Sequence, residues 1–109
     1  MTPEARTKNA VKKELDKAGV WYFMPAANGY GRAGIPDIIC CINGYFLAIE
    51  CKAGRGILTA LQERELNKIL AAGGAALVIY DDPSHFRALG TWIAALQLRK
   101  KHDYMASQI

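Results

Sequence analysis

The spacing of apolar residues divides the chain into helical and extended segments. Residues 3–18 are predicted to form a helix that is capped by Thr2, opens at Pro3 and ends at Gly19. Apolar side chains at three- and four-residue steps give this helix one face that is expected to pack on a core. That stripe consists of Val11, Leu15 and Ala18.

Further along the chain, short apolar runs bounded by turn residues alternate with longer helical patterns. A chain of 109 residues has room for one compact domain, so these elements are expected to share a single core over residues 1–109. The predicted strands are 21–24, 37–42, 45–51 and 75–80, and the predicted helices are 59–72 and a last one that begins at Asp82 and Pro83.

A tight hairpin is predicted between the two central strands. Asn43 and Gly44 separate the strands, and both residues tolerate the positive φ of a type I′ turn. A two-residue loop fixes the register, and counting back along both arms places Asp37 directly opposite Glu50. The Cβ atoms of these two acids are expected to lie about 5 Å apart on one face of the sheet.

Both faces of this hairpin are otherwise apolar, which is typical of strands in a sheet that is covered on both sides. Two carboxylates facing each other there repel and lose hydration, unless one is protonated or a cation lies between them. A hard divalent cation, Mg²⁺ or Mn²⁺, suits such oxygen ligands. Lys52 reaches the same face two residues beyond Glu50, so an ion pair between these two residues is the structural alternative.

A further acid lies on the apolar stripe of the first helix. Glu4 precedes Val11 by seven residues and Leu15 by eleven, and both steps return to nearly the same side of a helix. Glu14 is the alternative to Glu4 as the acid that this helix contributes, but Glu14 lies off the apolar stripe. In the structural alternative, Glu4 complements the helix dipole and pairs with Lys8 one turn further on.

Composition and charge exclude several classes of protein to which this chain could belong. With 51% hydrophobic and 22% charged residues, the chain is typical of a soluble globular protein rather than a disordered or coiled-coil one. No apolar run is long enough to span a bilayer and the N-terminus does not resemble a signal peptide, so a cytoplasmic location without membrane contact is expected. A formal net charge of +4 suits a polyanionic partner such as nucleic acid.

Three cysteines, Cys40, Cys41 and Cys51, lie inside apolar runs. Their number is odd, they form no C-x-x-C pair, and the two histidines are distant in the sequence. Buried free thiols in a reducing compartment are therefore expected, rather than a zinc site or disulfides.

A glycine-rich loop precedes the hairpin. Gly29, Gly31 and Gly34 have the spacing of a dinucleotide-binding turn. Such a turn must open a helix whose N-terminus faces the pyrophosphate, but here Pro36 and the strand from Asp37 follow at once. No nucleotide cofactor is therefore expected.

The helix predicted over 59–72 opens with a capping box. Thr59 and Gln62 are three residues apart, so each side chain reaches the backbone N–H of the other residue. This spacing gives Gln62 a structural role at the start of the helix. The apolar residues of this helix, all expected to be buried, are Leu61, Leu66, Ile69 and Leu70.

These acidic and basic positions resemble a nuclease signature. Pro36-Asp37, followed after twelve residues by Glu50-Cys51-Lys52, resembles the PD-(D/E)XK pattern. The wider arrangement resembles the VRR-NUC family, specifically its small stand-alone members from phages and bacteria. This resemblance covers about residues 4–80. It implies an α/β fold with a restriction-endonuclease-like αβββα(β) core, in which helices flank a central mixed sheet. The matching positions are Glu4, Gly34-Ile35-Pro36-Asp37-Ile38, Glu50-x-Lys52 and Gln62.

The same resemblance implies a metal-dependent DNA endonuclease that hydrolyses phosphodiester bonds with Mg²⁺ or Mn²⁺. By position, the metal ligands are Glu4, Asp37 and Glu50, with the backbone carbonyl of Cys51 as a further ligand. The implied catalytic residues are Asp37, Glu50, Lys52 and Gln62.

The expected partners follow from the charge and from the same resemblance. Stand-alone relatives are commonly homodimers that act on branched DNA, which implies a homodimer cutting four-way (Holliday) junctions in a bacterial or phage-infected cell. The competing hypothesis is a catalytically silent DNA-binding or adaptor module with a nuclease fold. Tyr30 is a candidate for stacking on a base. The candidate phosphate contacts are Lys8, Lys12, Arg32 and Arg55.

Overall fold

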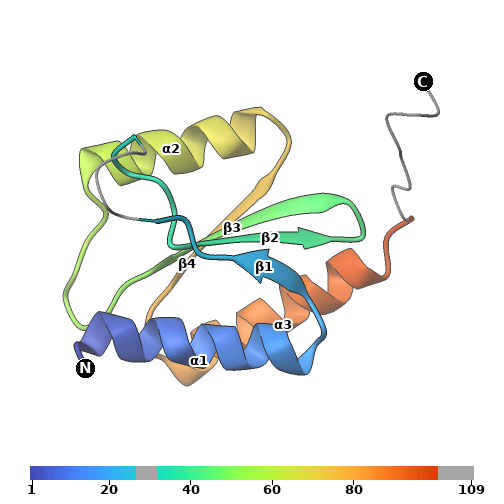
Figure 1. The fold of residues 1–109 in the computed structure, drawn as a ribbon, viewed down its shortest axis with the longest axis horizontal. Helices are drawn as coiled ribbons and strands as arrows, with labels where there is room; N and C mark the ends of the chain where they lie inside the picture. The colour runs from blue at the N-terminus through green and yellow to red at the C-terminus, as the bar shows by residue number, and fades with distance from the viewer. Residues whose placement is uncertain (27–31, 101–109) are drawn as a thin grey trace.

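Residues 1–26 and 32–100 are described by a computed structural model, in which helices cover both sides of a mixed sheet (Figure 1). The coarse prediction of an α/β fold is therefore confirmed. No helix in these two ranges is both long enough and apolar enough to cross a bilayer. The elements in chain order are α1 (Pro3–Lys17), β1 (Trp21–Phe23), β2 (Ile38–Ile42), β3 (Tyr45–Cys51), α2 (Ala60–Ala71), β4 (Ala75–Ile79) and α3 (Pro83–Gln97).

The four strands lie side by side in the order β1-β2-β3-β4. β1 and β2 are antiparallel, as are β2 and β3, whereas β3 and β4 run parallel because α2 carries the chain back across the sheet. Asn43 and Gly44 have φ angles of 54° and 82°, as the tight hairpin requires. The predicted register is confirmed from the pair Ile42 and Tyr45 next to the turn down to Ile38 and Ile49.

The first helix forms as its end signals predict. The Thr2 side chain accepts a hydrogen bond from the Ala5 N–H at 3.1 Å, and Pro3 occupies the first turn. After Ala18 the chain leaves the helix through Gly19, whose φ of 69° favours glycine. The apolar stripe of α1 packs with α3 on one face of the sheet (Figure 1). The fully buried residues of this layer include Val11, Leu15, Ile38, Cys40, Leu47, Ile49 and Leu89.

Asn43 also ties the hairpin to the last helix. Its side-chain amide donates to the backbone carbonyls of Leu96 at 3.2 Å and Gln97 at 2.6 Å. These carbonyls belong to the last turn of α3, whose carbonyls lack the helical partner four residues on, and the Leu96 carbonyl also accepts from the Arg99 N–H at 3.3 Å. The turn residue thus serves both the hairpin and the end of the helix.

The opposite face of the hairpin is less covered than its apolar sequence predicts. α2 lies over this face and packs against β4, so the part formed by β1 and β2 has no helix above it (Figure 1). Cys41 is exposed and Phe46 is almost half exposed, which makes the prediction of two fully covered faces wrong. The reason is that one 12-residue helix is too narrow to shield four strands.

The buried side of α2 also differs from its expected apolar stripe. Leu66 is buried and Ile69 is half-buried as predicted, but Leu61 and Leu70 are exposed. Glu65 is buried instead, because the segment before β2 packs on this side of the helix.

Candidate metal centre

Three carboxylates from three different elements converge at one end of the sheet. Glu4 is in the first turn of α1, Asp37 directly precedes β2, and Glu50 is the penultimate residue of β3. One carboxylate oxygen of each residue lies within 4.8 Å of those of the other two. The predicted proximity of Asp37 and Glu50 is therefore confirmed. Glu4 joins them as the stripe on α1 indicated, and Glu14 is not a member of this cluster.

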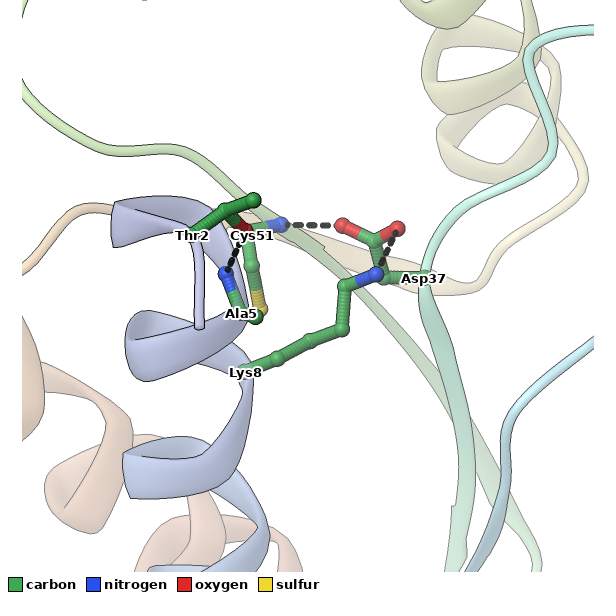
Figure 2. Close-up of polar contacts among 5 residues, drawn as sticks. All are labelled: Thr2, Ala5, Lys8, Asp37 and Cys51. Atoms are coloured by element: carbon green, nitrogen blue, oxygen red, sulfur yellow. Dashed lines mark hydrogen bonds and ion pairs between the residues drawn. The ribbon is translucent and has the colours of Figure 1, made fainter.

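Asp37 is held in place by two contacts (Figure 2). Its Oδ2 accepts a hydrogen bond from the backbone N–H of Cys51 at 2.8 Å, and its Oδ1 lies 3.5 Å from the Lys8 Nζ. Lys8 therefore approaches the acid that directly precedes β2, and the structural alternative, in which Lys8 pairs with Glu4, is not what the described residues show. This ammonium comes from α1 and offsets part of the negative charge of the cluster.

Glu50 is the most buried member of the cluster. Its side chain is 1% exposed, and its Oε2 has no hydrogen-bond partner among the residues that the structure describes. Burial raises the pKa of this carboxyl from 4.5 to about 9, and the hydrogen bond and negative charge of Asp37 add to this effect. A buried carboxyl with a free oxygen is costly unless a proton or a cation neutralises it.

Lys52 lies beside the acids without forming an ion pair with Glu50. Lys52 is 7% exposed, and its ammonium forms no salt bridge with any residue in the ranges 1–26 and 32–100. Its backbone N–H donates to the Ile79 carbonyl at 2.9 Å, which holds the end of β3 against β4. Its positive charge acts to lower the pKa of Glu50. The structural alternative of a strand-end ion pair between these two residues is therefore not what this geometry shows.

Gln62 forms the predicted capping box. Its Oε1 accepts from the Thr59 N–H at 3.0 Å, while the Thr59 hydroxyl accepts from the Gln62 N–H at 3.1 Å. A Cβ at Gly34 would overlap the Leu61 carbonyl and lie 2.9 Å from the Gln62 nitrogen. The segment leading to Asp37 thus packs directly on the first turn of α2. Within the described parts of the chain, no hydrogen bond joins the Gln62 side chain to the three acids.

The candidate phosphate contacts are distributed unevenly. Arg55 is exposed in the turn after β3, and Lys12 is half-buried on α1. Arg32 is exposed, but its guanidinium is already paired with an acid on α2. Tyr30 lies outside the described residues. Among the basic residues that the structure describes, Lys8 and Lys52 are the two that act on the acidic cluster itself.

Glu65 is a buried acid that sequence analysis missed. Its carboxylate is 2% exposed and lies 3.0 Å from the Arg32 Nε and 3.6 Å from an Arg64 terminal nitrogen. The sequence places Glu65 three residues after Gln62 on the same helix, which by itself indicates an ordinary surface acid. Its burial depends on the approach of the segment around Gly34.

The cysteines divide into two groups. Cys40 and Cys51 are buried, and burial raises the pKa of both thiols to about 12. Neither thiol is ionised near neutral pH, so neither is a nucleophile. Cys41 is exposed, which corrects the expectation that all three are buried. The backbone of Cys51 contributes to the cluster through its N–H group, which fixes Asp37.

No protein-family model and no curated protein sequence matches this chain.

Proposed function

We propose that the protein is a metal-dependent endonuclease that hydrolyses phosphodiester bonds in DNA. The observation that carries this proposal is the convergence of Glu4, Asp37 and Glu50 within 4.8 Å, together with the unpartnered oxygen of Glu50. Three carboxylates at that distance repel one another, and folding tolerates them when protons or a cation compensate their charge. A site with this arrangement supports the chemistry of a phosphate ester better than that of a neutral substrate.

The donor set fits Mg²⁺ or Mn²⁺. All three side chains offer carboxylate oxygens, which these hard cations prefer, and the cysteine thiols of this region are protonated and buried. When bound, such an ion polarises a phosphoryl oxygen and lowers the pKa of a coordinated water. The Cys51 carbonyl stays a predicted additional ligand.

The residues around the acids have distinct parts in this proposal. The Cys51 N–H and the Lys8 ammonium orient Asp37, so its carboxylate is fixed before substrate binds. Lys52 has no competing ion pair among the described residues, which leaves its ammonium available to orient the attacking water or to stabilise negative charge on the phosphate. Arg55 is exposed in the turn after β3, where it can contact a backbone phosphate next to the one that is cleaved.

The order of the elements also supports the proposed family. Helix, three strands, helix and strand follow one another as in the αβββα(β) core of restriction-endonuclease-like proteins, which the resemblance to VRR-NUC nucleases implies. On the same basis we propose branched DNA, and four-way junctions in particular, as the substrate of a homodimer. One cluster cuts one strand, so paired cuts across a junction need two subunits.

A cleavage assay with labelled junction, flap, single-stranded and linear duplex DNA tests this function. Wild-type protein is incubated with Mg²⁺, Mn²⁺, Ca²⁺ or EDTA, and binding of the ions alone is measured by calorimetry. Asp37→Asn is expected to lose metal binding and to reduce cleavage by at least 10²-fold. Glu63→Gln, which changes an exposed acid on α2, is the matched control and is expected to behave as wild type.

The outcomes separate the proposal from its main competitor. DNA binding with no cleavage under any metal condition would identify a silent DNA-binding or adaptor module. Equal cleavage by wild type and Asp37→Asn would show that the acid cluster is not the active site.

A further inference from the structure

Two large aromatic side chains on β1 are exposed on the same side of the sheet. Trp21 is 62% exposed and Phe23 is 48% exposed. Tyr22, between them, points to the other side, where its hydroxyl donates to the Asp16 carboxylate of α1 at 2.8 Å. Because side chains alternate along a strand, Trp21 and Phe23 face away from α1, toward the side on which α2 lies.

These aromatics belong to an open face, which we define as Trp21, Phe23, Ile39 and Cys41. Trp21 pairs with Cys41 and Phe23 pairs with Ile39, so the four side chains share one side of β1 and β2. Cys41 is exposed and Ile39 is half-buried, since α2 packs further across the sheet against β4 (Figure 1). Solvent therefore reaches an aromatic surface at the edge of the sheet.

The open face leads directly to the acidic cluster. Asp37 precedes Ile39 by two residues and Cys41 by four, which corresponds to about 7 and 13 Å along an extended chain. Phe23, which pairs with Ile39, is therefore nearer to the acids, and Trp21, which pairs with Cys41, lies further along the same side of the sheet. Their ring centroids are 5.8 Å apart and their planes are inclined by 57°, so neither ring covers the face of the other.

Two guanidinium groups lie at the same end of the sheet. Arg32 is in the segment that leads into β2, and its Nε lies 3.0 Å from Glu65, which also approaches Arg64. Arg32 is 68% exposed, so the nitrogens not used by Glu65 are available to a ligand. One buried carboxylate therefore holds two cations, and the surplus positive charge favours a phosphate backbone.

We infer that the open face binds the bases of a single-stranded DNA segment that continues from the cleaved phosphate. Exposed aromatic rings stack on unpaired bases of any sequence, whereas bases inside a duplex do not offer their faces. Arg32 and Arg64 contact the backbone of the same segment. The location next to the cleaved bond rests on the proposed function, and it specifies substrates with an unpaired strand, such as flaps or opened junctions.

The two tryptophans allow a direct test. Trp92→Phe leaves Trp21 as the only tryptophan, and Trp21→Phe leaves Trp92, which is partly exposed near the opposite edge strand β4. Each protein is titrated with a ten-nucleotide oligo(dT) and with a duplex of equal length, in Ca²⁺ and low salt, while tryptophan fluorescence is recorded. We expect saturable quenching of Trp21 by oligo(dT), little change with duplex, and an unchanged signal from Trp92.

Substitution gives an independent measurement. Trp21→Ala and Phe23→Ala are each expected to weaken oligo(dT) binding by roughly tenfold, which lies within the stacking range for one base. Trp92→Ala is the matched control and is expected to retain wild-type affinity. Oligo(dT) binding that leaves Trp21 fluorescence and the Trp21→Ala affinity unchanged would overturn the inference.

Two further outcomes distinguish the alternatives. If sedimentation shows a dimer that Trp21→Ala dissociates, the open face is a contact between copies of this chain and the inference is wrong. Quenching of Trp21 in a protein that cuts no DNA would retain the single-strand site while overturning the proposed nuclease. Metal-dependent cleavage without quenching would retain the nuclease and overturn the inference.

Discussion

Glu50 is the residue at which burial and charge conflict most strongly. It is enclosed by the sheet and by neighbouring elements, next to Asp37, and its Oε2 has no partner in the described part of the chain. In the absence of a cation, the folded protein favours the neutral carboxyl, whose pKa is raised to about 9. This conflict is consistent with a residue that binds a cation rather than one that stabilises the fold.

The titration of Glu50 predicts how stability depends on pH. Between about pH 4.5 and 9 the folded state retains a proton that the unfolded state has released, so the free energy of unfolding falls as pH rises. We expect the melting temperature in EDTA to decrease from pH 5 to pH 9, and Glu50→Gln to flatten this decrease. Thermal unfolding followed by circular dichroism measures both proteins, with Glu63→Gln as control. Parallel curves for wild type and Glu50→Gln would contradict the assignment.

Lys52 gives a second prediction at the scale of one residue. Methionine keeps most of the apolar stem and removes the charge, and no ion pair of the described residues is lost. Lys52→Met is therefore expected to remain folded while cleavage falls by roughly 10²- to 10⁴-fold. Single-turnover kinetics and urea unfolding measure the two effects. Lys68→Met, an exposed lysine on α2, is the control. A Lys52→Met rate within about threefold of wild type would remove the assigned role.

At the scale of elements, the contact between α2 and the segment before β2 is unusually close. Gly34 has a φ of 85°, and a side chain there would meet the backbone of Leu61 and Gln62 rather than a movable side chain. This contact lies three residues before Asp37 and carries Arg32 toward Glu65. The position of one acid of the cluster therefore depends on the packing of α2.

Substitution of Gly34 is expected to disturb this contact measurably. Gly34→Ala combines an unfavourable φ with a steric clash, whereas Gly19→Ala has a similar φ of 69° and open space around it. The φ term alone costs about 1–2 kcal/mol. We expect Gly34→Ala to lower the free energy of unfolding by at least about 1 kcal/mol more than Gly19→Ala, as measured by urea unfolding. Equal losses would show that the close packing on Leu61 does not matter for stability.

At the scale of the whole molecule, the acidic cluster links elements that are distant in the sequence. Glu4, Asp37 and Glu50 come from α1, from the entry to β2 and from β3, so a cation bound by all three connects α1 to the sheet. Binding to such a site stabilises the folded state alone, because the unfolded chain does not hold the three acids together.

Metal-linked stability follows from this arrangement. At a Mg²⁺ or Mn²⁺ concentration 100 times the dissociation constant, the folded state is expected to gain about 2.7 kcal/mol, which raises the melting temperature by on the order of 10 °C. Asp37→Asn is expected to lose this increase. Differential scanning calorimetry with metal and with EDTA compares the two proteins. An identical melting temperature for wild type under both conditions would argue against a divalent site.

Features that depend on short-range geometry could be predicted from the residue order alone. Thr2 and Thr59 cap their helices as predicted, because a cap involves residues only three positions apart. The turn at Asn43 set the register of the hairpin, and a fixed register brings Asp37 next to Glu50 without any knowledge of the rest of the fold.

Which groups meet across elements depends instead on how the helices and the sheet pack together. Lys8 pairs with Asp37 instead of Glu4, and Glu65 is buried under the segment that carries Arg32, because separate elements pack there. The solvent exposure of the open face around Trp21 likewise depends on how separate elements pack. An alternating pattern shows which side chains share a side of a sheet, whereas the placement of the covering helix depends on the packing of the whole chain.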